Sequence, residues 1–347
     1  MEAAFALEPT LEVHLFTSVP EWFFRDSLSG PFSIHRREVD PGPVAVDAFR
    51  TDLRATTTRF RTLLDDMPAQ SRALAGELRA MGVTGVLADI SPLGIAAGAE
   101  AGLPTVLLES FTWDQVLSFA GGDSPQIVGV ARDLSQVFAQ ADLRVRAQPV
   151  AGWPPTSDPP RQRALRVPPV ARPLNVDPQV TRRAIGVPDG VPLVLLTLGG
   201  SGGDFPVPDP VLSGRNAFFV VPGADEWSFG PNFLRAPTRS GYFNADLVAA
   251  ADAVVGKLGY STLAEAHQGR TRYGYMARPD FVETPALESW IAERGLGMAI
   301  ETGAAPGDGW VAGLDALLAL PPPLPAPEAE AGRAVAARAL LKFLQKG

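Results

Sequence analysis

The stretch AVVGKLGYSTLAEA, residues 253–266, decides the class of fold. Apolar, β-branched residues open it, the glycines Gly256 and Gly259 follow, and the residues from Thr262 onward have the composition of a helix. A buried strand that runs through a glycine turn into a helix is the repeating unit of α/β proteins with parallel sheets. We therefore predict an α/β fold and look for the same succession elsewhere in the chain.

The succession recurs on both sides of this stretch. Strands are predicted at Leu11–Phe16, Gly85–Ala88, Pro104–Leu108, Leu143–Val145, Leu193–Leu198, Ala217–Val221, Ala253–Val255, Thr271–Met276 and Gly297–Ile300. Helices are predicted at Asp47–Ala80, Leu93–Ala101, Ser124–Ala141, Pro178–Ile185, Asp246–Ala251, Leu287–Arg294 and Glu328–Leu344. Strands that alternate with helices, twice over, predict two doubly wound, Rossmann-like domains.

The composition changes at Pro149–Pro173, which is dense in prolines. Proline lacks a backbone N–H and disfavours regular structure, so no helix or strand is expected there. We predict one domain over residues 1–165 and a second over residues 166–325. The last predicted helix, at 328–346, is amphipathic.

The length and composition of the chain limit the classes of function that it can have. A chain of 347 residues with 46% hydrophobic and 20% charged residues is long enough for two packed cores and is not disordered. The absence of Cys excludes disulfides and thiolate chemistry, and the three scattered His residues give no metal-ligand spacing.

Charge and hydropathy exclude further classes of protein. The net charge of −8 lacks the basic footprint of a nucleic-acid binder. No apolar run is long enough to span a membrane, and the N-terminal residues have no basic region typical of a signal peptide. The expectation is a soluble, cytoplasmic protein without a nucleic-acid partner.

Two of the predicted strands are followed by residues of the kind that bind anions. Gly199, Gly200, Ser201 and Gly202 follow one strand, and glycines let backbone N–H groups approach a phosphate closely. A tight turn in a glycine-rich chain is the alternative. Gly259, Tyr260, Ser261 and Thr262 follow another strand and begin a helix, whose N-terminus attracts anions.

Two groups of charged residues lie beside these strand ends, and each has an alternative interpretation. Thr262 and Glu265 also have the spacing of a capping box, which needs no ligand. Arg278, Asp280 and Glu283 follow the strand that ends near Met276, where they suit sugar hydroxyls or are solvated loop charges.

Taken together, these segments resemble GT-B glycosyltransferases. In the second half the resemblance lies in LVLLTLGGSGG (193–203), GYFNADLVAAADAVVGKLGYSTLAEA (241–266) and ARPDFVETPALESWIAERGLGMAIE (277–301). In the first half it lies in VHLFTSVPEWFF (13–24) and VLADISPLGIAAGAEAGLPTVLLESFTWD (86–114). The chain is similar to the group of the lipid-linked N-acetylglucosaminyl transferase of peptidoglycan synthesis, and to the glycosyltransferase-like domain of arabinokinase-type proteins.

The resemblance implies an acceptor domain followed by a donor domain that binds a nucleotide sugar, with a UDP-sugar as substrate and no cofactor. It also implies that the last helix, 328–346, packs back on the first domain. The glycine loop at 199–202 would lie over phosphate, and residues 259–262 would hold the diphosphate. Phe243 would lie near the nucleobase and Glu265 would bind the ribose. Asp280 and Glu283 would face the donor sugar. Lys257 would reach a phosphate, and the alternative is that it is a solvated charge at the end of a strand.

The implied reaction is an inverting, metal-independent sugar transfer, which needs a general base near the acceptor. The alternative is a non-catalytic nucleotide-sugar-binding or interaction protein with a degenerate fold. The family begins with a strand and a glycine-rich loop that carries the base, whereas this chain opens with MEAAFALEPT. Against the resemblance, either the start codon is placed too late or the domain has lost this element.

Replacement bases are Asp89, which is alternatively a helix cap, and Glu109. The neighbouring turn of Phe111, Thr112 and Trp113 forms an acceptor wall or buried packing. Trp22, Phe23 and Phe24 are expected in an ordinary core helix, with a peripheral membrane or acceptor contact as the alternative. The His residues are expected to be structural.

Overall fold

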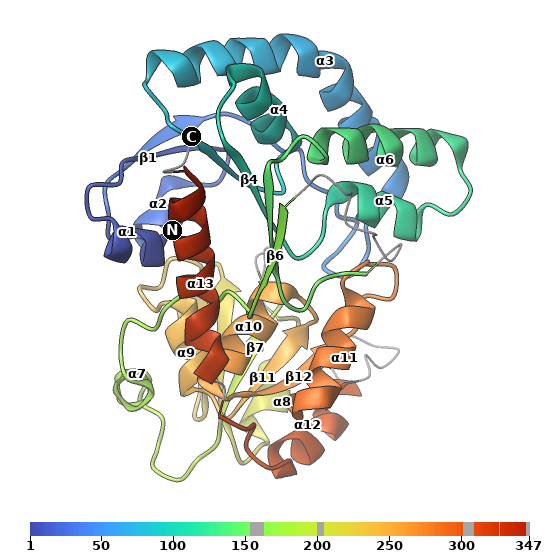
Figure 1. Ribbon diagram of the computed structural model, residues 1–347. Helices are drawn as coiled ribbons and strands as arrows, with labels where there is room; N and C mark the ends of the chain where they lie inside the picture. Colours follow the sequence, from blue (N-terminus) through green and yellow to red (C-terminus); the bar gives the residue numbers. More distant parts are fainter. Residues whose placement is uncertain (153–162, 200–204, 301–308, 326, 345–347) are drawn as a thin grey trace. The chain divides into compact units, whose positions relative to one another are not determined.

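The structure is a computed structural model of the chain, and it describes residues 1–152, 163–199, 205–300, 309–325 and 327–344. Two compact units divide the chain. Unit 1 comprises Met1–Val170, Asp280–Glu283 and Ala331–Gly347, and unit 2 comprises Ala171–Pro279 and Thr284–Glu330. Both are built from parallel strands and helices (Figure 1), which confirms the predicted α/β fold.

Unit 1 contains two separate parallel sheets, with strand orders β1-β2 and β3-β4-β5-β6 in the described part of the chain. Its strands are β1 (Val13–Thr17), β2 (Phe32–Arg36), β3 (Val86–Asp89), β4 (Thr105–Glu109), β5 (Leu143–Ala147) and β6 (Arg163–Val167). Its helices are α1 (Glu2–Leu7), α2 (Glu21–Arg25), α3 (Leu53–Ala80), α4 (Pro92–Ala101), α5 (Trp113–Ala120) and α6 (Pro125–Phe138).

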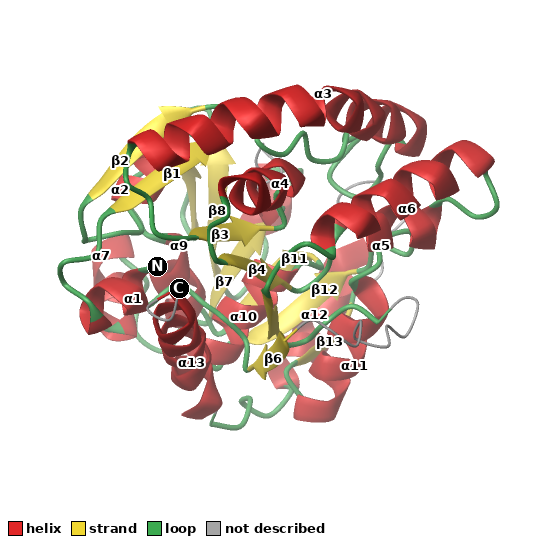
Figure 2. Cartoon of the chain, turned by 45° about the horizontal axis from the view of Figure 1, so that its top comes forward, coloured by secondary structure: helices red, strands yellow, loops and turns green. Residues whose placement is uncertain are grey.

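The core of unit 1 forms where α3, α4 and α6 pack together (Figure 2). Phe60, Leu93 and Leu134 come from these three helices and are fully buried. The long helix α3 begins at Leu53 and not at the predicted Asp47. The reason is local, because the Asp52 carboxylate accepts the N–H of Ala55 and caps the helix there.

The prediction that no regular element survives between Pro149 and Pro173 is wrong. Strand β6 occupies the proline-free window Arg163–Val167 and pairs in parallel with β5. It is the edge strand of its sheet, and the prolines that flank it lie outside the ladder. Proline is compatible with such a position because an edge strand pairs on one side only.

Unit 2 contains one seven-stranded sheet with the order β13-β12-β11-β7-β8-β10-β9, parallel except for β9. Its strands are β7 (Leu193–Thr197), β8 (Phe218–Ala224), β9 (Ser228–Phe229), β10 (Phe233–Pro237), β11 (Ala253–Lys257), β12 (Arg272–Met276) and β13 (Gly297–Ala299). Its helices are α7 (Pro178–Ile185), α8 (Asp209–Ser213), α9 (Asn244–Ala250), α10 (Tyr260–Gly269), α11 (Thr284–Arg294) and α12 (Gly309–Ala319). Helix α13 (Pro327–Leu344) begins in unit 2 and ends in unit 1.

The strand order of unit 2 places a topological switch between β7 and β11. From β7 the chain moves outward through β8 and β10, and it then returns to the other side of β7 to add β11, β12 and β13. Ligands of open α/β sheets bind beyond the carboxyl ends of the strands at such a switch. The contact between the two strands is close, because a Cβ on Gly256 would lie 1.9 Å from the Thr197 carbonyl oxygen.

Helix α2 differs from its prediction. None of its residues is buried, and Phe23 is 39% exposed, so it is not an ordinary core helix. Phe23 and Phe24 instead line a cavity in unit 1 that is described below. No helix in the part of the chain that the structure describes is long and apolar enough to cross a membrane.

Candidate functional site

The carboxyl ends of β7 and β11 form the candidate site in unit 2. Gly199 follows β7 with a φ of +69°, a left-handed conformation that suits glycine, and its N–H donates to Thr197 Oγ1 at 3.0 Å. The predicted Gly200, Ser201 and Gly202 lie outside the described residues. The adjacent strand β11 ends at Lys257 and leads directly into α10.

The N-terminus of α10 carries no side-chain cap. Gly259 is the N-cap residue, and a Cβ added to it would meet open space among the described residues. Ser261 is exposed in the first turn. The first N–H groups of a helix have no partner within it, and the helix dipole makes this end positive. The end of α10 therefore offers backbone donors and partial positive charge to an anion.

The alternative interpretation of Thr262 and Glu265 as a capping box is wrong. Helix α10 begins at Tyr260, so Thr262 is already inside it and is not the N-cap residue. The Glu265 carboxylate accepts Arg172 Nε at 2.7 Å and Asn244 Nδ2 at 2.8 Å, and the residue is 2% exposed. Glu265 thus ties α10 to the segment before α7 and to the start of α9.

Phe243 lies beside this ion pair, and Lys257 ends the strand that leads into α10. Phe243 is the N-cap residue of α9, and the guanidinium of Arg172 lies 4.9 Å from the centroid of its ring. Such a distance allows a cation–π contact. Lys257 is the half-buried last residue of β11, and its carbonyl oxygen accepts the hydroxyl of Tyr273.

The segment Asp280–Glu283 belongs to unit 1, although the sequence prediction placed it in the second domain. Phe281 packs on Phe111 with ring centroids 5.3 Å apart, and Glu283 accepts Ser110 Oγ at 2.9 Å. Asp280 is exposed and Glu283 is 5% exposed. The sequence could not reveal this placement, because it arises from apolar contacts between segments far apart in the chain.

Glu109 is buried in an ion pair at the end of β4. It accepts Arg144 Nε at 2.9 Å and Arg146 Nε at 3.0 Å, and Glu109 and Arg146 are each 3% exposed. Two guanidinium groups donate to its oxygens, so the carboxylate is held in a buried ion pair and does not face an acceptor. The structure therefore argues against Glu109 as a general base.

Asp89 and Asp40 are the titratable groups that stand out in unit 1. Asp89 ends β3 with an exposed side chain that lines a cavity, and desolvation by the protein around this cavity raises the pKa of its carboxyl group. Its alternative role as a helix cap is wrong, because Ser91 caps α4 by accepting the N–H of Gly94.

Sequence reasoning missed Asp40. Burial raises its pKa to about 6, against the lowering effect of a 2.6 Å hydrogen bond from Trp113 Nε1. Trp113 is 6% exposed and packs on Phe60, so its turn is buried packing and not an exposed wall. Asp40 lies in an irregular segment after β2, where no periodicity marks it.

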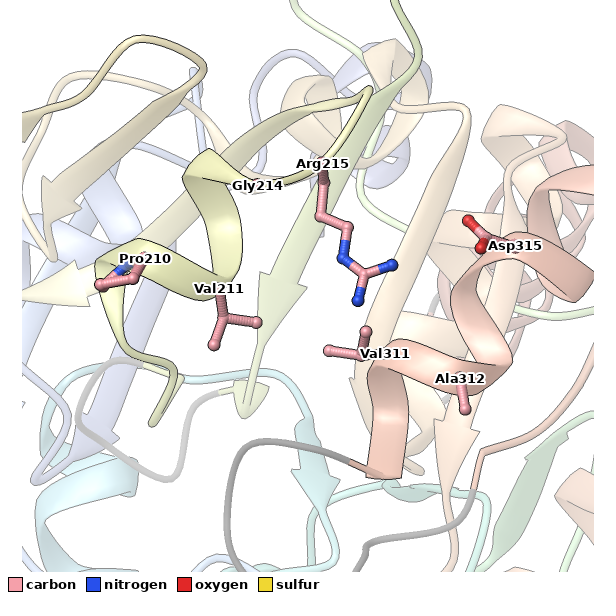
Figure 3. A pocket seen from close by; sticks show the side chains of 7 residues that line it. All are labelled: Pro210, Val211, Gly214, Arg215, Val311, Ala312 and Asp315. Carbon is pink, nitrogen blue, oxygen red and sulfur yellow. The ribbon is translucent and has the colours of Figure 1, made fainter.

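A shallow pocket of about 500 Å³ lies between α8 and α12 in unit 2. Figure 3 shows Arg215 extending from the end of α8 toward α12, which carries Val311, Ala312 and Asp315. None of its lining residues was predicted to be functional. Among the described residues, no three His, Asp or Glu side chains gather closely enough to hold a metal ion.

Comparisons with known proteins agree with this architecture. No model of a known protein family matches the chain. L-arabinokinase of Arabidopsis thaliana is 24% identical over 286 residues, which cover 81% of this chain and 27% of that protein. The chain therefore spans about a quarter of the length of this curated relative.

Solved glycosyltransferases share the fold along nearly the whole chain. SnogD from Streptomyces nogalater has a TM-score of 0.57 at 15% identity, covering 99% of this chain and 94% of that one. UGT89C1 from Arabidopsis thaliana, solved with UDP, has a TM-score of 0.60 at 12% identity, with 99% and 93% covered. VinC, solved with dTDP, has a TM-score of 0.54 at 15% identity, with 100% and 95% covered. The chain has the two-domain GT-B fold of glycosyltransferases.

Proposed function

We propose that this protein is an inverting, metal-independent glycosyltransferase that moves a hexosyl or N-acetylhexosaminyl group from a UDP-sugar to a small acceptor. The observation that carries the proposal is the uncapped N-terminus of α10, which opens at the switch point beside Gly199. UDP and dTDP, with which two of the similar glycosyltransferases were solved, are the kind of ligand that such an end suits.

In the proposal, unit 2 binds the donor. The residues from Gly259 to Thr262 hold the diphosphate through backbone N–H groups and the Ser261 hydroxyl, and Gly199, after the adjacent strand β7, lies beside it. Lys257 adds a positive charge nearby. These groups stabilise the negative charge that develops on the leaving nucleoside diphosphate, a task that fixed N–H donors perform without a metal ion.

Glu265 and Phe243 complete the nucleoside end of the proposed site. A carboxylate has about four lone-pair positions. Arg172 and Asn244 donate to two of them, and ribose hydroxyls would donate to the rest. The backbone beside Phe243 would face the nucleobase. Asp280 and Glu283 would bind hydroxyls of the donor sugar.

Unit 1 supplies the acceptor side and the general base. The acceptor hydroxyl attacks the anomeric carbon, the bond from that carbon to the diphosphate oxygen breaks, and the base takes the hydroxyl proton. Asp89 is the proposed base, because it ends β3 with an exposed carboxyl group that lines the cavity of unit 1. Glu109 is not proposed for this role.

Binding and turnover of labelled nucleotide sugars test the proposal. UDP-, GDP- and dTDP-sugars are titrated while the melting temperature is followed, since a ligand that binds only the folded state raises it. The expected result is a concentration-dependent rise, largest with a UDP-sugar. The absence of a shift with every nucleotide would overturn the proposal.

A second candidate, a nucleotide-sugar-binding protein without transfer activity, is favoured by one observation. The carboxylate at the end of β4 is neutralised by two arginines, so it is not available as a base. This candidate predicts the same shift in melting temperature. It also predicts that UDP release stays at background with every acceptor and that Asp89→Asn leaves binding unchanged.

A further inference from the structure

The connection from β3 to α4 contains a strained residue. Ile90 lies between Asp89, the last residue of β3, and Ser91, the N-cap residue of α4, and its φ is +48°. For a β-branched residue such a left-handed backbone is an outlier. Among the described residues, the other non-glycine residue with a positive φ is Arg270, the C-cap of α10, where a left-handed residue is common. Ile90 precedes a helix, so this explanation does not apply to it.

The length of the connection does not require the strain at Ile90. Leu258 and Gly259 likewise join β11 to α10 across two residues, and neither has a positive φ. A strand therefore reaches the next helix over this distance without a left-handed backbone. Strained residues persist only where the surrounding structure holds them, and they gather at functional sites, where the strain contributes to preorganisation.

Contacts on both sides hold the turn at Ile90. On the side of the strand, β3 pairs with β4 as far as Asp89. On the side of the helix, Ser91 Oγ donates to the carbonyl of Val39 at 2.8 Å and accepts the N–H of Gly94 at 3.1 Å. The half-buried side chain of Ile90 packs against the apolar core of unit 1. The strained backbone is therefore fixed at both ends and anchored by its own side chain.

The turn determines where the Asp89 carboxyl group lies. The cavity of unit 1 has a volume of about 910 Å³, and Asp89 and Ser91 line it, whereas Ile90 between them does not. Side chains of a strand point alternately to its two faces, and in β3 Ala88 is buried while Asp89 is exposed. Because Ile90 turns the chain directly into α4, the Asp89 carboxyl group stays at the end of the sheet and on the cavity.

We propose that Ile90 is a positioning residue for the sugar transfer, because its left-handed backbone, anchored by its side chain and by Ser91, aims the Asp89 carboxyl group into the cavity of unit 1. This inference rests on the proposed function, in which Asp89 is the general base. A base must lie within hydrogen-bond reach of the proton that it takes, and a displacement of about 1 Å can lower a rate about 100-fold. The strained turn therefore serves the rate of transfer and not the binding of the donor.

Three substitutions separate positioning from stability. Ile90→Gly removes the strain and the apolar anchor, because glycine adopts many other backbone conformations. Ile90→Val keeps a β-branched apolar side chain and is the conservative variant. Glu100→Gly, at an exposed position in the last turn of α4, is the control for a glycine that only weakens the helix. Ile90→Ala, which removes most of the anchor, replaces Ile90→Gly if that variant does not fold.

Release of UDP from UDP-glucose with a panel of acceptors is the first readout. Ile90→Gly is expected to lower kcat at least about tenfold and to leave the KM for UDP-glucose unchanged, since unit 2 binds the donor in the proposal. Ile90→Val and Glu100→Gly are expected to keep the kcat of the unaltered protein. An unchanged kcat in Ile90→Gly, or a loss that Glu100→Gly shares, overturns the positioning role.

Titration of the Asp89 carboxyl group is a second readout that needs no turnover. Desolvation raises the pKa of this group, and NMR of labelled carboxyl carbons, assigned with Asp89→Asn, follows its titration. In Ile90→Gly we expect this pKa to fall toward its ordinary value, because the carboxyl group gains access to water. In Ile90→Val it should stay raised, since Asp40 and the amino group of Met1, two charged groups near Asp89, are the same in both variants.

The two readouts distinguish the positioning role from the proposed function. If the unaltered protein releases no UDP but the pKa of Asp89 falls in Ile90→Gly alone, the proposed function fails and Ile90 still positions Asp89. The same pKa for Asp89 in the unaltered protein and in Ile90→Gly overturns the positioning role, whatever the activity. A fall in this pKa that Glu100→Gly shares also overturns it, because it reports a general loosening of unit 1.

Discussion

At the residue scale, Gly259 has the greatest consequence for the proposed site. It is the N-cap of α10, and it sits where the switch point of the sheet opens. Its φ of −160° is ordinary extended backbone, so the position does not need glycine for conformational reasons. The absence of a side chain there leaves the first N–H groups of the helix accessible.

Gly259→Val is therefore expected to fold normally and to bind nucleotide poorly. Among the described residues the new side chain meets open space, and it stands at the N-terminus of α10. We expect the Kd for UDP to rise at least about tenfold, which corresponds to about 1.4 kcal/mol, with the melting temperature nearly unchanged. Isothermal titration calorimetry measures the change.

The matched control is Gly76→Ala, at an exposed position of α3 where an added Cβ also meets open space. It should leave the Kd for UDP unchanged. Equal affinity of Gly259→Val and the unaltered protein would contradict the role given to α10.

Glu265→Ala is expected to destabilise the protein even without ligand. The change leaves the guanidinium of Arg172 and the amide of Asn244 without their carboxylate partner. We expect the free energy of unfolding to fall by about 2 kcal/mol, measured by urea denaturation. The substitution is also expected to weaken the binding of UDP more than the binding of an isolated diphosphate, because only UDP carries a ribose. A loss of stability with unchanged selectivity for UDP would leave Glu265 a purely structural role.

Asp40 gives the stability of unit 1 a dependence on pH. Its folded pKa of about 6 lies above the ordinary value of 3.8, so between these values the folded state binds a proton that the unfolded state does not. The free energy of unfolding therefore decreases as pH rises from about 4 to about 6, by at most about 3 kcal/mol, and is then constant.

Comparison with Asp40→Asn isolates this effect, because contributions of other groups cancel in the difference. The unaltered protein should lose stability relative to the variant as pH rises through this window. Urea denaturation at several pH values measures the difference. A difference that stays constant from pH 4 to pH 7 would show that Asp40 has an ordinary pKa.

The residues of the candidate site were predictable from the sequence to different degrees. Gly199 and Gly259 follow apolar strands, and that local pattern places them at strand ends. Glu109 has a similar position, but its two arginine partners come from the next strand and are visible only once β4 and β5 are paired. Asp40 carries no local signal, because its pKa depends on burial by distant segments.

At the scale of elements, the close contact of β7 and β11 shapes the switch point. Gly256 is buried where these strands pair, and its Cβ position is filled by the Thr197 carbonyl. The alternation of strands and helices was predictable because each element has its own periodicity. Strand β6 was not predictable, because a short stretch without prolines forms a strand here only through its pairing with β5.

Gly256→Ala is expected to separate β11 from β7. A Cβ 1.9 Å from a backbone oxygen cannot be accommodated without moving a strand. We expect a loss of about 3 kcal/mol or more in the free energy of unfolding, or failure to fold, because a well-packed core tolerates added volume poorly. Gly259→Ala is the control for this substitution and should be neutral by circular dichroism melting. A stable Gly256→Ala protein would contradict the close contact.

At the scale of the whole molecule, the two units exchange chain segments. Asp280–Glu283 lies in the second half of the sequence but belongs to unit 1, and helix α13 begins in unit 2 and ends in unit 1. That the last helix packs on the first domain was an expectation from the resemblance to GT-B glycosyltransferases, because an amphipathic pattern does not identify the partner domain. The assignment of residues 280–283 to unit 1 was not expected, since a four-residue segment is too short to show a periodicity.

The central claim is that the N-terminus of α10 holds the diphosphate of a UDP-sugar. Hydrogen exchange with and without saturating UDP tests it most directly, because it reports on the backbone N–H groups that are proposed to bind. The account predicts that UDP slows exchange at Gly259, Tyr260, Ser261 and Thr262 and leaves the first turn of α3 unchanged. UDP binding that protects other segments but not these four residues would contradict it.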